Sequence, residues 1–135
     1  MAILRDFQDT RVENSRTCYQ KVIKGLVIEM VYLDAIRLFK ERLKSVYGDR
    51  LVDIILYGSY ARGDQDKESD VDLLVLLKDI NDFWKEVHLV EDIAYEINDS
   101  FNWKVFISAI PEDIEMFKTK KIPLFLNIQR EGISV

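Results

Sequence analysis

A single cysteine, a single histidine, two prolines and five glycines are spread over a chain of 135 residues. Because Cys18 has no second cysteine to pair with, an internal disulfide is excluded, which favours a reducing compartment such as the cytoplasm. The scarcity of proline and glycine leaves no low-complexity linker. No apolar run approaches the roughly 20 residues that a membrane-spanning helix needs. We therefore expect a cytoplasmic protein without a membrane segment.

Basic residues are also in the minority, with 19 Lys and Arg against 24 Asp and Glu, so the net charge is −5. Nucleic-acid binding needs clustered Lys and Arg to contact phosphates, and the balance of charge therefore argues against a general nucleic-acid binder. The negative net charge is still compatible with a local basic patch around one phosphate site. The length suits one domain with a core of its own.

Hydrophobic periodicity divides the chain into a polar arm, residues 1–21, and a domain, residues 22–135. The domain is expected to be α+β, a small mixed β-sheet with helices packed against it. Helices are predicted from Val22 to about Tyr47, over residues 82–100, from Pro111 onward, and over Ile122–Arg130. Strands are predicted over Leu51–Tyr57, Val71–Leu77 and Asn102–Ile110.

The stretch Leu51–Leu77 holds two apolar runs separated by a polar loop. Each run is short and bounded by turn residues, which is typical of a strand buried on both faces. Asp70 and Asp72 stand at the start of the second run, and alternate residues of a strand project to the same face. Two neighbouring carboxylates repel each other, and a divalent cation would relieve the repulsion. The pair is therefore the candidate metal site.

The other end of the loop has the composition of a phosphate-binding turn. Gly58 follows the first strand directly, permits a positive φ and lets the backbone approach a ligand closely. Ser59 and the residues after it suit the first turn of a helix, whose unpaired N–H groups attract anions. Arg62 adds a positive charge. Carboxylates for Mg²⁺ beside a turn for phosphates are what metal-assisted phosphate chemistry needs.

The spacing of these residues carries a family resemblance. Gly58-Ser59 is followed by residues 60–69 and then by Asp70-Val71-Asp72, in a context that reads GSYARG and SDVDL. The pattern resembles the signature of the nucleotidyltransferase superfamily. In its small size the chain resembles the minimal nucleotidyltransferase domains of that superfamily, namely the MntA-like antitoxins of HEPN toxin–antitoxin pairs. This resemblance covers the order of elements from about Met30 to Val135.

The resemblance implies a role for each matched residue. Gly58 and Ser59 would hold the triphosphate of a nucleotide, most simply ATP. Asp70 and Asp72 would bind Mg²⁺ as the catalytic carboxylates. A hydroxyl group would attack the α-phosphorus and release pyrophosphate, and the acceptor would belong to a HEPN-type toxin that this protein restrains. Arg62 would contact phosphate or form an ion pair with a nearby acid.

One departure from the family pattern keeps a second interpretation open. Active relatives carry a third carboxylate on the next strand, and the matching position falls near Phe106, in a segment without any acid. The alternative is a nucleotidyltransferase-like module that neutralises its toxin by binding alone. Self-assembly into a homo-oligomer is a further possibility. Tyr60, within the loop, would either stack on a base or cover the edge of the core.

Overall fold

The computed structural model describes residues 15–66 and 68–135, with side chains from Glu29 onward. The chain divides into two compact units between Asp34 and Ala35. In the first unit the described residues belong to helix α2, Ser15–Tyr47, which continues into the second. The expected arm thus lies outside the described residues as far as residue 14, and residues 15–21 are helical.

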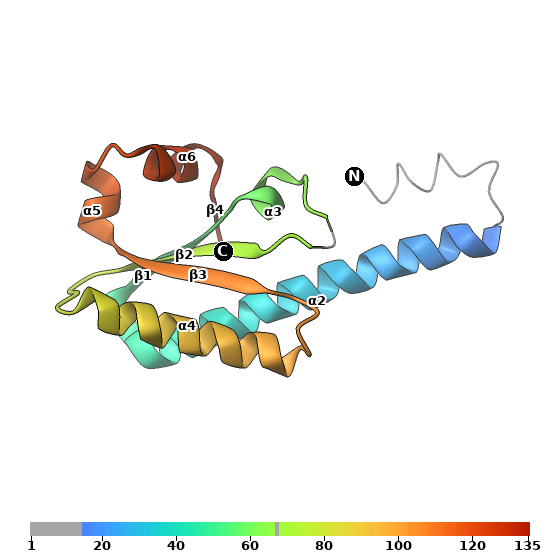
Figure 1. The fold of residues 1–135 in the computed structure, drawn as a ribbon, viewed down its shortest axis with the longest axis horizontal. Helices are drawn as coiled ribbons and strands as arrows, with labels where there is room; N and C mark the ends of the chain where they lie inside the picture. Colours follow the sequence, from blue (N-terminus) through green and yellow to red (C-terminus); the bar gives the residue numbers. More distant parts are fainter. Residues whose placement is uncertain (1–14, 67) are drawn as a thin grey trace. The chain divides into compact units, whose positions relative to one another are not determined.

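The second unit is built on one four-stranded sheet with the order β3-β2-β1-β4 (Figure 1). Strand β1 pairs antiparallel with both β2 and β4, whereas β2 and β3 run parallel. The strands are β1 Leu51–Tyr57, β2 Val71–Leu77, β3 Ile107–Asp113 and β4 Ile133–Ser134. A mixed sheet covered by helices confirms the predicted α+β fold class.

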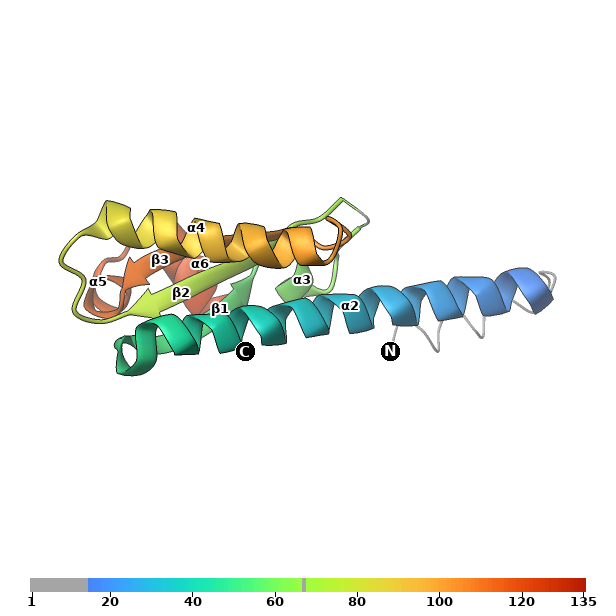
Figure 2. The ribbon, with the colours of Figure 1, turned by 90° about the horizontal axis from the view of Figure 1, so that it is seen from below.

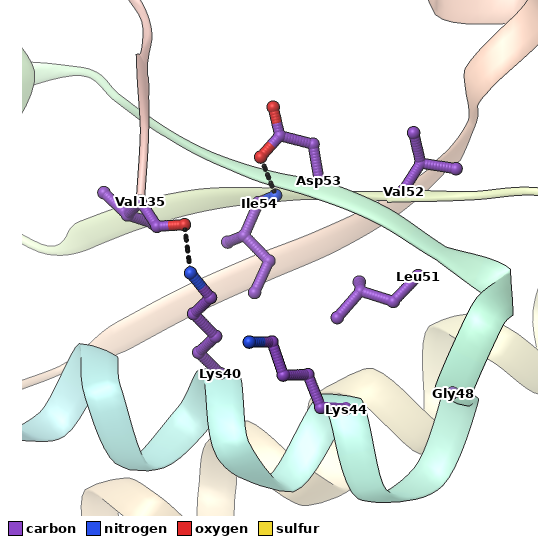
Figure 3. Close-up of a pocket in the computed structure, with 8 residues that line it drawn as sticks. All are labelled: Lys40, Lys44, Gly48, Leu51, Val52, Asp53, Ile54 and Val135. Atoms are coloured by element: carbon purple, nitrogen blue, oxygen red, sulfur yellow. Dashed lines mark hydrogen bonds between the residues drawn. The ribbon is translucent and has the colours of Figure 1, made fainter.

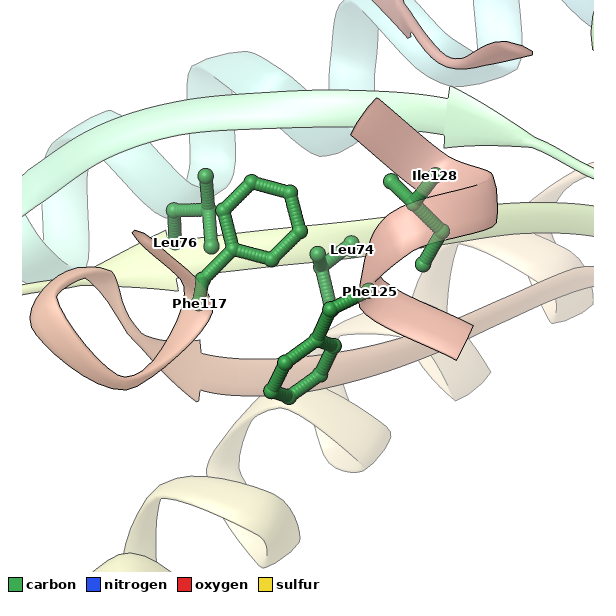
Figure 4. Close-up of a cluster of buried hydrophobic side chains, with 5 residues drawn as sticks. All are labelled: Leu74, Leu76, Phe117, Phe125 and Ile128. Carbon is green, nitrogen blue, oxygen red and sulfur yellow. The ribbon is translucent and has the colours of Figure 1, made fainter. Parts of the chain in front are cut away.

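Helices cover both faces of this sheet. Helix α4, Phe83–Ser100, and the part of α2 from Ala35 onward run along one face (Figures 1 and 2). Helices α5, Ile114–Thr119, and α6, Pro123–Glu131, lie on the other. There the side chains of β2 meet two aromatic rings in a buried cluster of Leu74, Leu76, Phe117, Phe125 and Ile128 (Figure 4). Strand β2 is therefore buried on both faces, as its continuous apolar run predicts.

The third strand begins later than predicted. It starts at Ile107 rather than at Asn102 and extends to Asp113. The residues before it form a turn, in which Asn102 and Trp103 both have positive φ values, 54° and 59°. Pro111 lies inside β3 and does not start a helix. Because β3 is an edge strand, a proline in it removes no hydrogen bond from the ladder if its nitrogen faces outward.

The helix ends explain the remaining boundaries. Asp113, rather than Pro111, caps the next helix, since its Oδ1 accepts hydrogen bonds from the N–H groups of Glu115 and Met116. Asp82 caps α4 as predicted, accepting from Lys85 N–H at 3.2 Å. Among the helices that the structure describes, none is both long and apolar enough to cross a membrane.

Candidate active site at the start of strand β2

A tight turn connects the end of β1 to the four-residue helix α3, Ser59–Arg62. Gly58 opens it with φ 76° and Gly63 closes it with φ 79°, both in the range that favours glycine. The carbonyl oxygen of Gly58 accepts from Arg62 N–H at 3.1 Å. The first N–H groups of a helical turn have no partner within the turn, which makes such a turn a common place for an anion.

The antiparallel pairing of β1 and β2 brings this turn against the acidic pair. Tyr57, the last residue of β1, lies opposite Asp72 in the register. A Cβ atom placed on Gly58 would overlap the Oδ2 atom of Asp72. The backbone at Gly58 therefore approaches the Asp72 carboxylate more closely than any other residue type would permit. The structure thus brings together the two ends of the loop that the sequence singled out.

Asp70 and Asp72 lie one strand period apart at the start of β2, with Asp70 exposed and Asp72 half-buried. Partial burial and then the negative charge of Asp70 raise the pKa of the Asp72 carboxyl, while the positive charge of Arg62 acts in the opposite direction. A partly buried carboxylate beside a second negative charge is a fitting place for a divalent cation, whose positive charge would stabilise the ionised form of Asp72. The donor set suits Mg²⁺, which prefers carboxylate oxygens.

Arg62 takes part in ion pairs within the structure. Its Nε atom lies 3.2 Å from Oδ2 of Asp64, and its Nη1 atom lies 3.8 Å from Oε2 of Glu131 in α6. The side chain remains half-exposed. Arg62 thus forms the ion pair that the sequence suggested as one of its two roles. The other role, contact with a phosphate, stays compatible with this position, because exposed ion pairs are weak and a phosphate could displace them.

Two tyrosines border the acidic pair. Burial and the charge of Asp72 raise the pKa of Tyr57. Burial and then the charges of Asp66 and Asp70 raise the pKa of Tyr60. Tyr60 is half-buried in α3, which allows it to cover the core edge while one part of the ring stays accessible.

No carboxylate lies beside the acidic pair at the start of β3. Strand β3 runs parallel to β2, and Ser108 lies beside Asp72 in the register. The carbonyl oxygen of Phe106 accepts from Val71 N–H at 2.8 Å, so Phe106 stands next to the acidic pair. Among the described residues, no group of three or more Asp, Glu, His or Cys side chains could hold a metal ion. The β3 residue that registers beside Asp72 is thus a serine, and the residue just before this strand is a phenylalanine.

A cavity of about 440 Å³ elsewhere in the second unit contains none of these residues (Figure 3). Its polar groups largely satisfy one another. Lys40 Nζ donates to the Val135 carbonyl at 2.9 Å, and Asp53 Oδ1 accepts from Ile54 N–H at 2.8 Å and from Ser134 Oγ at 2.6 Å. We therefore place the candidate active site at the β2 start and not in this cavity.

Some neighbours of the acidic pair do not follow from the sequence pattern. Tyr57 and Ser108 are adjacent to Asp72 only because of the strand pairing, although the hairpin-like loop could have indicated Tyr57. Glu131 reaches Arg62 from the far end of the chain. Its place in the Arg130-Glu131-Gly132 segment before β4 gives no signal of that contact.

Comparison with known proteins identifies relatives of this arrangement. Residues 36–126 match the family described as the nucleotidyltransferase domain. A candidate protein adenylyltransferase of Methanocaldococcus jannaschii is 35% identical over 106 residues, covering 78% of this chain and 100% of that protein. A second such protein of the same organism is 41% identical over 86 residues, covering 64% and 78%. The crystal structure of a candidate nucleotidyltransferase from Sulfolobus solfataricus has the same fold, with a TM-score of 0.58 at 18% identity over 81% of this chain and 83% of that one.

Proposed function

This chain belongs to the nucleotidyltransferase domain family, and we propose that it is a Mg²⁺-dependent enzyme that transfers AMP from ATP to a hydroxyl group of a partner protein. One observation carries the proposal. The backbone of Gly58 lies against the Asp72 carboxylate, so the phosphate-binding turn and the acidic pair form one continuous surface. The protein adenylyltransferase names of the relatives support AMP as the group transferred and a protein as acceptor.

Each residue of the surface has a task in this reaction. Gly58 and Ser59 bind the triphosphate through backbone N–H groups and the serine hydroxyl. Arg62 brings positive charge to the phosphates. Asp70 and Asp72 hold Mg²⁺, which when bound offsets negative charge on the phosphate oxygens. The acceptor oxygen forms a bond to the α-phosphorus, the bond from that phosphorus to the pyrophosphate oxygen breaks, and the hydroxyl proton passes to solvent.

The lack of an acid at Ser108 and Phe106 affects which kind of acceptor hydroxyl can react. An aliphatic hydroxyl needs a general base to become a nucleophile, whereas a phenol loses its proton far more readily, with a pKa of about 10. A tyrosine acceptor therefore suits a site without a third carboxylate. We assign it to a HEPN-type toxin, as the resemblance of the loop motif implies, which makes this protein the antitoxin of the pair.

The experiment is a label-transfer assay with α-³²P-ATP, Mg²⁺ and a HEPN-type toxin protein as the proposed acceptor. Transfer of label to that protein is expected with the wild type and is expected to fall at least about a hundredfold in Asp70→Asn or Asp72→Asn, the loss typical of a removed transition-state contact. Asp79→Asn is the matched control, because Asp79 is exposed beyond the opposite end of β2. Equal transfer by all four proteins would refute the role of the pair.

The absence of an acid at Ser108 and Phe106 also favours a second candidate function, neutralisation of the toxin by binding alone. The two candidates differ in stoichiometry. A transferase inactivates many toxin molecules per copy, and inactivation requires ATP. A binding module titrates the toxin one to one without ATP and is insensitive to Asp70→Asn.

A further inference from the structure

A hollow of about 280 Å³ lies along the outer edge of β3, where this strand faces α4. Small residues form part of its wall, and three aromatic rings, two isoleucine side chains and one carboxylate border it. The members that matter here are Glu91, Tyr95, Trp103, Phe106, Ser108 and Ile110. None of them is used in the transfer chemistry described above, except that Ser108 lies beside Asp72.

The strand edge at this hollow is protected against pairing with another strand. Because Val71 N–H donates to Phe106 O, the backbone groups of Ile107, and of every second residue after it, point outward. The Asn98 side chain covers those of Ile107, accepting from its N–H at 2.7 Å and donating to its carbonyl at 3.1 Å. Pro111, two positions beyond Ala109, offers no N–H. The hollow therefore suits a side chain rather than an added strand.

Three aromatic rings stand in a row over the hollow and remain open to solvent. Tyr95 and Trp103 meet edge to face with centroids 5.1 Å apart, and Trp103 and Phe106 lie 5.8 Å apart. Their exposed fractions are 60%, 44% and 47%. Trp103 takes its place at a φ of 59°, which a bulky residue rarely adopts, with its N–H held by the Asn98 carbonyl at 2.9 Å. A bulky residue at a positive φ is strained, so the contacts around Trp103 must hold it in place.

The single charge bordering the hollow is negative. Glu91 lies one helical turn before Tyr95 on α4, so the two side chains share a face. Among the residues that the structure describes, Glu91 has no ion-pair partner, whereas Glu96 on the same helix pairs with Arg42. A carboxylate beside exposed aromatic faces is complementary to a cation, and a planar guanidinium fits such a place best because it also stacks on rings.

The hollow adjoins the acidic pair. Phe106 connects the hollow with the acidic pair. Its ring belongs to the aromatic row, and its carbonyl accepts a hydrogen bond from Val71, the residue between the two aspartates. Adjacent strands are about 4.8 Å apart and an extended chain advances about 3.3 Å per residue, so roughly two to four residues would link an occupant of the hollow to a group at Asp72.

We propose that this hollow, bounded by Glu91, Trp103 and Phe106, binds an arginine side chain of the protein acceptor and thereby positions the acceptor hydroxyl at Asp70 and Asp72. Only the positioning of the acceptor hydroxyl rests on the proposed transferase function. Binding of the guanidinium depends on the hollow alone. The two parts can therefore be tested separately.

Binding is measured by tryptophan fluorescence in a Trp84→Phe background, which leaves Trp103 as the one tryptophan of the chain. The probes are N-acetyl-arginine amide and N-acetyl-citrulline amide, which differ in charge and hardly in shape. The arginine probe is expected to bind about fivefold more tightly, a typical effect of one cation–π contact with a carboxylate nearby. Glu91→Gln should reduce the difference, because the carboxylate is lost while the cation–π contact remains, and Asp92→Asn, a neighbouring exposed acid that does not border the hollow, should keep it unchanged. Equal affinity for both probes would overturn the proposal.

Positioning is measured by transfer of label from α-³²P-ATP to two peptides, acetyl-Arg-Gly-Gly-Tyr-amide and its citrulline counterpart. The arginine peptide should be labelled at about fivefold higher kcat/KM, through KM. Glu91→Gln should reduce this advantage while the Mg²⁺–ATP affinity stays constant. Equal rates for both peptides would refute the positioning role. Absence of label from both, with the arginine preference in fluorescence retained, would refute the transferase function and not the arginine site.

Discussion

At position 58 two separate requirements fall on one residue. The backbone there has a φ of 76°, and the space where a Cβ would stand is taken by the Asp72 carboxylate. Position 63 also has a positive φ, 79°, but its ψ of 16° lies in the left-handed helical region, whereas the ψ of −154° at position 58 is open essentially to glycine alone. Nothing lies within 4 Å of the Cβ position of residue 63. Gly63 is therefore a comparison site at which a positive φ occurs without crowding of the acidic pair.

Gly58→Ala is expected to lower the affinity for Mn²⁺, used as a probe for Mg²⁺, at least about tenfold, because the new methyl group displaces the Asp72 carboxylate. Gly63→Ala should leave that affinity unchanged while destabilising the fold by about 1 kcal/mol, the cost of a left-handed alanine. Calorimetric titration and urea unfolding of both variants provide the measurements. Equal losses of Mn²⁺ affinity in the two variants would contradict the crowding argument.

The protonation of Asp72 predicts a pH dependence. Burial and the charge of Asp70 raise its pKa, so the metal-free folded chain becomes less stable as pH rises from the ordinary aspartate range through the raised value. Metal binding requires the ionised form and is therefore lost on acidification at a higher pH than for an ordinary aspartate. Because Arg62 lowers this pKa, Arg62→Gln should move the midpoint of Mn²⁺ binding to higher pH. A midpoint that moves down in this variant would contradict the electrostatic assignment.

At the scale of elements, strands β1 and β2 and the α4 N-cap follow the sequence closely. A short continuous apolar run between turn residues fits a buried strand better than any other element. Asp82 is a favourable N-cap residue at the start of the helical pattern. The start of the third strand is mispredicted because the apolar residues of the preceding turn run on into those of the strand. That turn depends on Trp103 at a positive φ, which the apolar pattern does not indicate. The edge position that tolerates Pro111 is a property of the sheet order, which no local pattern contains.

The same limit applies to the candidate site. The motif spacing indicates Gly58, Ser59, Asp70 and Asp72, because these residues lie close in sequence as well as in space. Ser108 comes to Asp72 only through the parallel β2–β3 pairing. A pairing between segments that are far apart along the chain depends on the whole sheet, so its register could not be inferred from either segment.

Helices α2 and α4 are joined to the β1 start by a network around a buried carboxylate. Glu86, 6% exposed, accepts from Tyr47 Oη at 2.7 Å and from Arg50 Nη2 at 2.8 Å. Burial alone would raise the pKa of Glu86, but these hydrogen bonds and the charge of Arg50 outweigh it, and the pKa is lowered.

Glu86→Gln is expected to cost about 1–3 kcal/mol in free energy of unfolding at pH 7, because a neutral amide is a poorer acceptor for the Arg50 guanidinium. Since the folded pKa is below the unfolded one, this advantage of the wild type is present above the unfolded pKa and disappears as pH falls through the folded value. Urea unfolding across acid pH measures it. Glu96→Gln, which breaks the exposed Arg42 pair, should cost less than about 1 kcal/mol. A cost as large as that of Glu86→Gln would contradict the importance of burial.

At the scale of the whole molecule, the family match and the described core lie in the second unit. The match covers residues 36–126, and the buried hydrophobic residues run from Ala35 to Ile128. Within α2 the buried positions recur at helical spacing from Ile36 through Phe39 and Leu43, all after the division at Asp34. The elements that position the acidic pair are therefore contained in residues 35–135.

A chain of residues 35–135 is accordingly expected to fold, to unfold within about 5 °C of the full chain, a difference of roughly 1 kcal/mol, and to bind Mn²⁺ equally well. By contrast, Phe39→Ala in the full chain should cost about 3–5 kcal/mol, because this fully buried ring lies in the retained part of α2. Thermal unfolding and Mn²⁺ titration of both proteins make the comparison. If the shortened chain unfolds far earlier than Phe39→Ala, residues 1–34 supply stability to the second unit. If it is stable but no longer transfers AMP to the proposed acceptor protein, these residues serve recognition of the acceptor and not the fold.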